Sequence, residues 1–243
     1  MKTDLSILMF LFAVTTCGHA DVHVKLESHT DSYYYGGITY PEENEVWEAW
    51  VGDNKSAYIS ERRSVIVDLN TNMLSFINHL DSTYAEAALP FQWPNLVSEE
   101  MAGRLEMYRT TGTVTESREI KTIGKWACQR YDVNSWIPYA GGRYDEREIV
   151  LWITPDVPID INVYKQIRTV LRQLRNYDEV LVSELGKIEG YQIASETTTY
   201  VKGFGYQSTE WVTDMSERQP PADVYSVPEG YTKKEALTWE DLE

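Results

Sequence analysis

The sequence has few of the residues that build metal centres and disulfide frameworks. It contains two cysteines, Cys17 and Cys128, and four histidines. Cys17 and His19 lie in an N-terminal stretch that we interpret below as removable, which leaves one cysteine without an intrachain partner. No spacing of Cys, His and acidic residues completes a zinc site. We therefore predict neither a bound metal nor a cofactor.

The familiar catalytic motifs are also missing. There is no Gly-x-Ser-x-Gly, phosphate-binding loop or dinucleotide fingerprint. Residues 68–72 imitate the start of a calcium loop, but Met73 replaces the required glycine and His79 the required glutamate. Cys128, flanked by Trp126 and Ala127, is predicted to be a small buried side chain rather than a nucleophile. The sequence predicts no catalytic residue and favours a protein that is not an enzyme.

Positive charge is scarce. The chain has 22 Lys and Arg against 38 Asp and Glu, a formal net charge of -16. A nucleic-acid surface needs clustered Lys and Arg, and so does electrostatic docking on anionic lipid. The composition therefore argues against both kinds of partner.

Long hydrophobic runs are absent beyond the N-terminus. Residues 5–14 form an apolar run too short to span a bilayer, followed by Gly18 and Ala20, the small residues that a leader peptidase reads. We predict a signal peptide over residues 1–20 and a periplasmic or secreted protein with no transmembrane segment in the mature chain. The alternative is a lipid anchor on Cys17, although Thr16 is a poor residue before a lipidated cysteine.

What the chain does contain is strand-forming sequence. With 42% hydrophobic and 12% aromatic residues, it can bury one sizeable core. Residues 112–133 predict two long strands hinged at Gly124, in which either both faces are covered or a bulge shifts the register. Residues 143–154 predict another long strand, apolar on both faces from Ile149 to Ile153. Residues 82–96 are read as irregular, because Pro90 and Pro94 interrupt them.

Two segments have helical spacing. Ser98 caps a helix over residues 98–108, and Asp160 caps a long one over residues 162–185 that stops at Gly186. The apolar stripe of the long helix consists of Val163, Ile167, Val170, Leu171, Leu174, Leu181 and Leu185. Its opposite face carries Lys165, Arg168, Arg172 and Arg175, the densest basic cluster in the chain. We interpret this basic face as solvated, with reception of an acidic head group as the alternative.

Three sequence blocks resemble a family of exported bacterial proteins known only as a domain of unknown function. They are the Gly-x-Trp-x-Cys-x-x-Tyr core at residues 124–131, the run at residues 149–156 and the run at residues 227–231. That family is similar in architecture to the LolA and LppX lipoprotein carriers. The resemblance implies an α+β fold in which an antiparallel curved sheet, or half-barrel, has two main helices covering its concave face. It carries over no functional residue.

We therefore expect one domain over residues 21–231, with an acidic tail over residues 232–243. The leading functional hypothesis is an exported binding or carrier protein for an apolar or amphiphilic ligand, with lipid or lipoprotein acyl chains as examples. The alternative is a non-enzymatic interaction or structural protein of the cell envelope with a filled core. The candidate cavity-lining residues are Val163, Ile167, Val170, Leu171, Leu174, Leu151 and Trp152.

The first prediction concerns export. Because small residues occupy positions 18 and 20 directly after the apolar run, cleavage should leave Asp21 as the mature N-terminus. Intact-mass spectrometry of the exported protein checks this. A mature chain that begins at a diacylated Cys17 would contradict it and support the lipid anchor.

Overall fold

A computed structural model describes residues 20–201 and 204–242. The strands are β1 (Asp21–Thr30), β2 (Tyr33–Tyr35), β3 (Ile38–Tyr40), β4 (Glu43–Val51), β5 (Lys55–Ile59), β6 (Arg63–Asp68), β7 (Met73–Asn78), β8 (Thr83–Ala88), β9 (Thr111–Ile123), β10 (Trp126–Tyr139), β11 (Gly142–Thr154), β12 (Tyr191–Val201), β13 (Phe204–Arg218) and β14 (Thr232–Lys233). The helices are a 3-10 turn (Trp93–Asn95), α1 (Glu99–Met107), α2 (Ile161–Leu174), α3 (Glu179–Gly186) and α4 (Trp239–Leu242).

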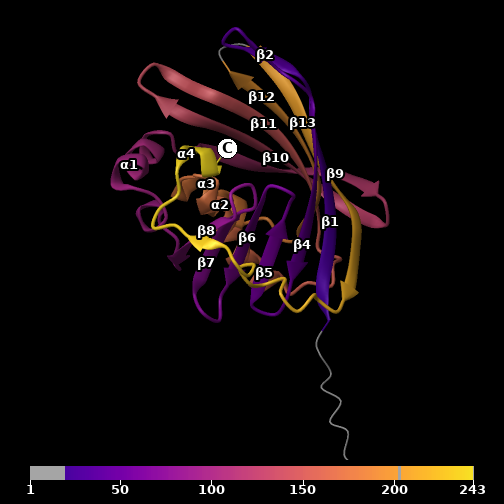
Figure 1. The fold of residues 1–243 in the computed structure, drawn as a ribbon. Helices are drawn as coiled ribbons and strands as arrows, with labels where there is room; N and C mark the ends of the chain where they lie inside the picture. The colour runs from indigo at the N-terminus through magenta and orange to yellow at the C-terminus, as the bar shows by residue number, and fades with distance from the viewer. Residues whose placement is uncertain (1–19, 202–203, 243) are drawn as a thin grey trace, which may run out of the picture.

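Twelve of the strands form one curved sheet that does not close. Their order is β14-β8-β7-β6-β5-β4-β1-β13-β12-β11-β10-β9, antiparallel except for the parallel β14–β8 pair. The two remaining strands form the β2–β3 hairpin. Figure 1 shows the sheet bending round, with the helices drawn between the β5–β8 part and the β10–β12 part. The predicted class, a large curved and mostly antiparallel sheet with few helices, is confirmed.

The central hairpin has the predicted form. β9 and β10 meet at Gly124, whose φ of +57° is a left-handed conformation that suits glycine. The pairing of β10 with β9 shifts register between Gln129 and Tyr131. Trp126 and Cys128 join one core cluster, whereas Val133 belongs to another. Cys128 is fully buried, and this burial raises the pKa of its thiol, as expected for an unreactive side chain.

The long helix is not continuous, and the prediction of one helix over residues 162–185 is wrong. α2 ends at Leu174, and Asn176 then adopts a left-handed φ of +58°. The Asn176 side-chain amide donates to the Leu105 carbonyl at the end of α1, 2.8 Å away. Asp178 starts α3 by accepting from the Leu181 amide at 2.8 Å. A local Asn-x-Asp pattern therefore breaks the helix despite a continuous apolar stripe.

A further strand occupies part of the segment that was predicted to be irregular. β8 pairs with β7 in full antiparallel register, and Ala85 and Ala87 face the core. Alanine has low strand propensity, so its alternation is a weak signal in the sequence. With β8, the β5–β8 meander packs against α1 and α2 around a single large cluster.

The C-terminal segment, predicted as an acidic tail beyond the domain, is anchored to the sheet edge. β14 pairs with β8, and Leu237 is buried. Asp241, 5% exposed, accepts hydrogen bonds from Lys234, Asn78 and the Thr238 backbone amide at 2.6, 3.0 and 2.9 Å. Through Leu237 and Leu242, this segment covers part of the cluster between the β5–β8 meander, α1 and α2.

The predicted signal peptide lies almost wholly outside the described residues, which begin at Ala20. Within the described ranges, none of the helices is long and apolar enough to cross a membrane.

The Asp241 anchor gives a prediction about pH. Burial opposes ionisation of this carboxyl, but hydrogen bonds from Lys234, Thr238 and Asn78 outweigh it and lower its pKa to about 2. Because the pKa is lower in the folded state, the stabilisation is present above the unfolded pKa and lost as pH falls toward the folded one. Asp241→Asn should lower the free energy of unfolding by about 2 kcal/mol near neutral pH. Urea titrations should show this difference narrowing below about pH 4. A difference independent of pH would contradict the assignment.

Candidate ligand-binding cavity

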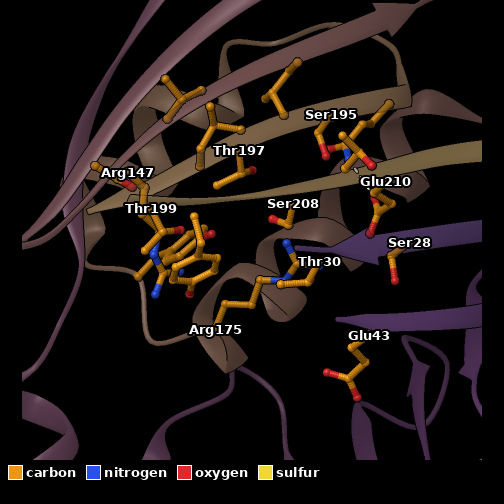
Figure 2. Close-up of a pocket in the computed structure, with 18 of the residues that line it drawn as sticks. Ser28, Thr30, Glu43, Arg147, Arg175, Ser195, Thr197, Thr199, Ser208 and Glu210 are labelled. Carbon is orange, nitrogen blue, oxygen red and sulfur yellow. Dashed lines mark hydrogen bonds between the residues drawn. The ribbon is translucent and has the colours of Figure 1, made fainter. Parts of the chain in front are cut away.

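A cavity of about 740 Å³ lies between the helices and the inner wall formed by β1 and β10–β13. Its wall includes α2, the α2–α3 turn and α3 on one side, and residues of the β2–β3 hairpin and the start of β4 at its rim. Figure 2 shows side chains from several strands converging on this space, with Arg175 reaching into it from the end of α2.

Strand register builds the sheet wall as three rows of paired residues. One row runs Ser135–Arg147–Thr199–Tyr206, and the next runs Val133–Ile149–Thr197–Ser208–Thr30. The third row runs Leu151–Ser195–Glu210–Ser28. Because side chains alternate along a strand, residues two apart on each strand share the cavity face. The wall is therefore set by pairing across five strands and not by one motif.

The cavity has an apolar part. It is formed by Val133, Ile149 and Leu151 from the sheet and by Leu181 and Leu185 from α3. All except Ile149 are buried, and all five belong to one core cluster. An acyl chain or other apolar group would find its contacts here.

The rest of the wall is polar and carries positive charge. Hydroxyl side chains line the strands, namely Ser28, Thr30, Ser135, Ser195, Thr197, Thr199, Ser208 and Thr209. Arg168, Arg172 and Arg175 face the cavity from α2 and its end, and Arg147 faces it from β11. The basic face of this helix was interpreted as solvated. The structure instead turns three of its four cations into the cavity, and only Lys165, which pairs with exposed Glu189 at 3.3 Å, lies outside it.

Stacked tyrosines form the rim. Tyr33 of β2 lies between Tyr40 of β3 and Tyr206 of β13, with ring centroids 4.6 and 4.1 Å apart. Burial, together with the neighbouring tyrosines, raises the pKa of Tyr33. This stack packs the β2–β3 hairpin against the start of β13.

The residues predicted to line a cavity are dispersed by the fold. Leu151 does line it. Ile167 and Val170 are buried in the cluster shared with β6–β8 and α1, and Val163, Leu171 and Leu174 pack against that cluster. Trp152 points to the opposite side of β11, where it helps to line a smaller hollow of about 380 Å³.

The sequence did not predict that serine and threonine side chains would line the cavity wall. Ser195, Thr197 and Thr199 alternate along one strand, which is a visible signal, but Thr alternation is common in any exposed strand. The basic face was identified from the sequence, but the strands opposite its arginines were not. In the described ranges, no group of three or more His, Cys, Asp or Glu side chains is placed to hold a metal ion.

Comparison with known proteins shows likeness in fold only. No family model matches the chain, and no curated protein matches it. Among solved structures, it is similar to a DUF1329 family protein from Desulfovibrio piger, with 8% identity, a TM-score of 0.32, and coverage of 85% of this chain and 89% of that one. It is also similar to a putative outer membrane lipoprotein-sorting protein domain from Vibrio parahaemolyticus, with 9% identity, a TM-score of 0.30, and coverage of 85% and 90%.

These two neighbours are of the kinds that the sequence resemblance named, a domain of unknown function and a lipoprotein-sorting fold. The functional argument below rests on the cavity and not on this likeness.

The location of Ile167 generates a prediction. Its side chain is completely buried in the cluster between α2 and the β6–β8 meander, away from the cavity. Ile167→Ala should therefore lower the free energy of unfolding by about 2–5 kcal/mol, measured by urea denaturation. Gln166→Ala, at the exposed neighbouring position, should change it by less than about 0.5 kcal/mol. Equal effects from the two variants would show that α2 is not packed in this way.

Proposed function

We propose that this protein is an exported binding or carrier protein that holds an amphiphilic ligand in the cavity between the sheet and α2–α3. Lipids and lipoprotein acyl chains are the ligand class that suits the site. Leu151, with the other apolar lining residues of β10, β11 and α3, would contact the chain. The other predicted residues on α2 would pack against the β6–β8 meander, on the side of the helix away from the cavity, namely Val163, Ile167, Val170, Leu171 and Leu174.

The observation that carries the proposal is the two-sided lining of one large cavity. Its volume, about 740 Å³, lies within the range typical of small-molecule sites. One part of the wall is made of aliphatic side chains and the other of hydroxyls and arginines. A purely apolar ligand would remove water from the arginines without replacing its hydrogen bonds. A purely polar ligand would leave the aliphatic surface in contact with water. A molecule with both characters satisfies both parts.

We further propose that α2 and α3 together are the two helices that cover the concave side of the sheet. α2 packs through Ile167 against the β6–β8 part, and α3 packs through Leu181 and Leu185 against β10 and β11. A single domain that starts at residue 21 and includes the anchored C-terminal segment fits this arrangement. We propose that it is exported after removal of residues 1–20, to the periplasm or outside the cell.

The competing function is an envelope interaction protein with a filled core. A filled core has no room for a ligand, whereas this cavity could take a small amphiphile. The two functions therefore differ in whether the purified protein binds an apolar molecule.

Thr197 allows a test that separates binding from folding. Its side chain points into the cavity, and that of Thr198 points to the other side of β12. Thr197→Trp should fill the cavity and weaken binding of N-phenyl-1-naphthylamine, a neutral apolar dye, by about tenfold or more. Thr198→Trp is the matched control and should bind within about twofold of the unchanged protein. Dye fluorescence measures affinity, and native mass spectrometry shows any lipid that co-purifies.

Absence of dye binding and of co-purified lipid in the unchanged protein would overturn the carrier proposal. Equal loss of binding in both tryptophan variants, each still folded, would place the dye outside this cavity.

A further inference from the structure

Three arginines that face the cavity lie on one side of a helix. Arg168, Arg172 and Arg175 are spaced four and three residues apart, so their side chains project from adjacent turns of α2 and its C-terminal cap. All three line the cavity. Arg172 is buried, Arg168 is partly buried, and Arg175 exposes its side chain into the cavity space.

These guanidinium groups lack acidic partners. Within residues 20–201 and 204–242, no carboxylate lies within 4.0 Å of any of the three. Arg168 donates to the Gln192 side-chain oxygen at 3.3 Å. Arg172 donates from Nη2 to the Leu185 carbonyl at 3.0 Å, while its Nε has no partner. Arg147, across the cavity, pairs with Asp145 at 2.6 Å, but its Nε is also unsatisfied.

The nearest cavity acid is already engaged. Glu210 accepts from the Gln192 side-chain amide at 2.8 Å, so Gln192 stands between Glu210 and Arg168. Glu42 and Glu43 lie at the exposed rim, and Glu43 is 3.8 Å from Arg62. The α2 side of the cavity therefore holds more positive than negative charge.

A buried, unpaired cation is costly. Burial, and to a lesser degree the adjacent Arg168, lower the pKa of Arg172 to about 9. The group remains charged at neutral pH, with only 6% of the residue exposed. Buried charges in proteins are normally paired, and a buried donor without a partner needs an explanation.

A purely structural role explains part of this arrangement. Arg172 reaches the C-terminal end of α3 through the Leu185 carbonyl, where a positive charge is favourable. That contact uses one donor. It accounts neither for the free Nε of Arg172 nor for two more arginines on the same side of the cavity.

We propose that Arg168, Arg172 and Arg175 form an oxyanion subsite that binds the phosphate or carboxylate head group of the amphiphile. This inference rests on the function proposed above and names the chemical class of its ligand. Guanidinium groups match both oxyanions with paired donors, and the threonine and serine hydroxyls of β12 and β13 supply further donors. The apolar lining from β10, β11 and α3 then receives the chain.

The overall charge of the chain favours a single anionic molecule bound in the cavity over an extended anionic surface such as a bilayer. A chain of net charge -16 repels lipid bilayers and nucleic acid at long range. Three arginines that line a cavity act mainly at short range, on an anion that has entered it.

The test compares molecules with one chain and different heads. Dodecyl phosphate, dodecanoate and neutral dodecanol are titrated against protein loaded with N-phenyl-1-naphthylamine, and inorganic phosphate is titrated separately by calorimetry. The two anionic amphiphiles should displace the dye at concentrations about 10- to 100-fold lower than dodecanol does, as expected for hydrogen bonds to a charged group. Inorganic phosphate should bind more weakly than dodecyl phosphate, because it lacks the chain.

Variants assign the preference to the arginines. R172Q should reduce the advantage of the anions to about twofold or less while leaving dodecanol affinity unchanged. R175Q removes a side chain that is exposed in the cavity, so it tests the same subsite if R172Q does not fold. R118Q, an exposed arginine on β9 outside the cavity, is the matched control and should keep the full preference.

The outcomes separate this inference from the proposed function. Dodecanol binding as tightly as dodecyl phosphate, or R175Q and R172Q keeping the full preference, would overturn the subsite and leave the carrier function standing. If inorganic phosphate binds and none of the three chain-bearing molecules does, the carrier function is overturned and the arginines are assigned to a free anion. Failure of all four molecules to bind would overturn both.

Discussion

The site depends on one constraint: α2 packs one face against the β6–β8 meander and turns another toward strands β10–β13 and β1 of the same sheet. Its apolar face packs against the β6–β8 meander through Ile167 and Val170. Three arginines of its basic face line the cavity opposite β10–β13 and β1. The space between that basic face and the sheet is the cavity. It carries positive charge because the apolar face of α2 is already packed and the arginine-bearing face is the one that lines it.

The sheet contributes the other half of the site through register. Leu151, Ser195 and Glu210 come from three strands and lie side by side only because β11, β12 and β13 pair in this alignment. A slip of one residue would exchange the cavity face for the outer face along a whole strand. The Asn176 break matters in the same way, since it lets α3 turn its leucines toward the apolar part of the cavity.

Much of the fold could be predicted from local pattern. The β9–β10 hairpin at Gly124, the burial of Cys128 and the capping of α1 and α2 all follow from residues close together in the chain. β8 was missed because alanine alternation is a weak strand signal, and the α2–α3 break was missed because a regular apolar stripe outweighed Asn176 and Asp178. Of the residues predicted to line a cavity, Leu151 lines the large cavity and Trp152 the smaller hollow, on opposite sides of one strand.

The sequence by itself determined the chemistry available: an acidic chain, a strand-rich body, one buried thiol and a helix with an apolar and an arginine-bearing face. Those properties depend on composition and on periodicity over a few turns. Only the tertiary structure decided what each helix face meets. The same spacing of Arg168, Arg172 and Arg175 is compatible with a surface in bulk water or with a cavity wall, because local sequence does not specify the strands opposite it. Those strands, β1 and β10–β13, lie far apart in the chain, and their pairing builds the wall that the arginines face.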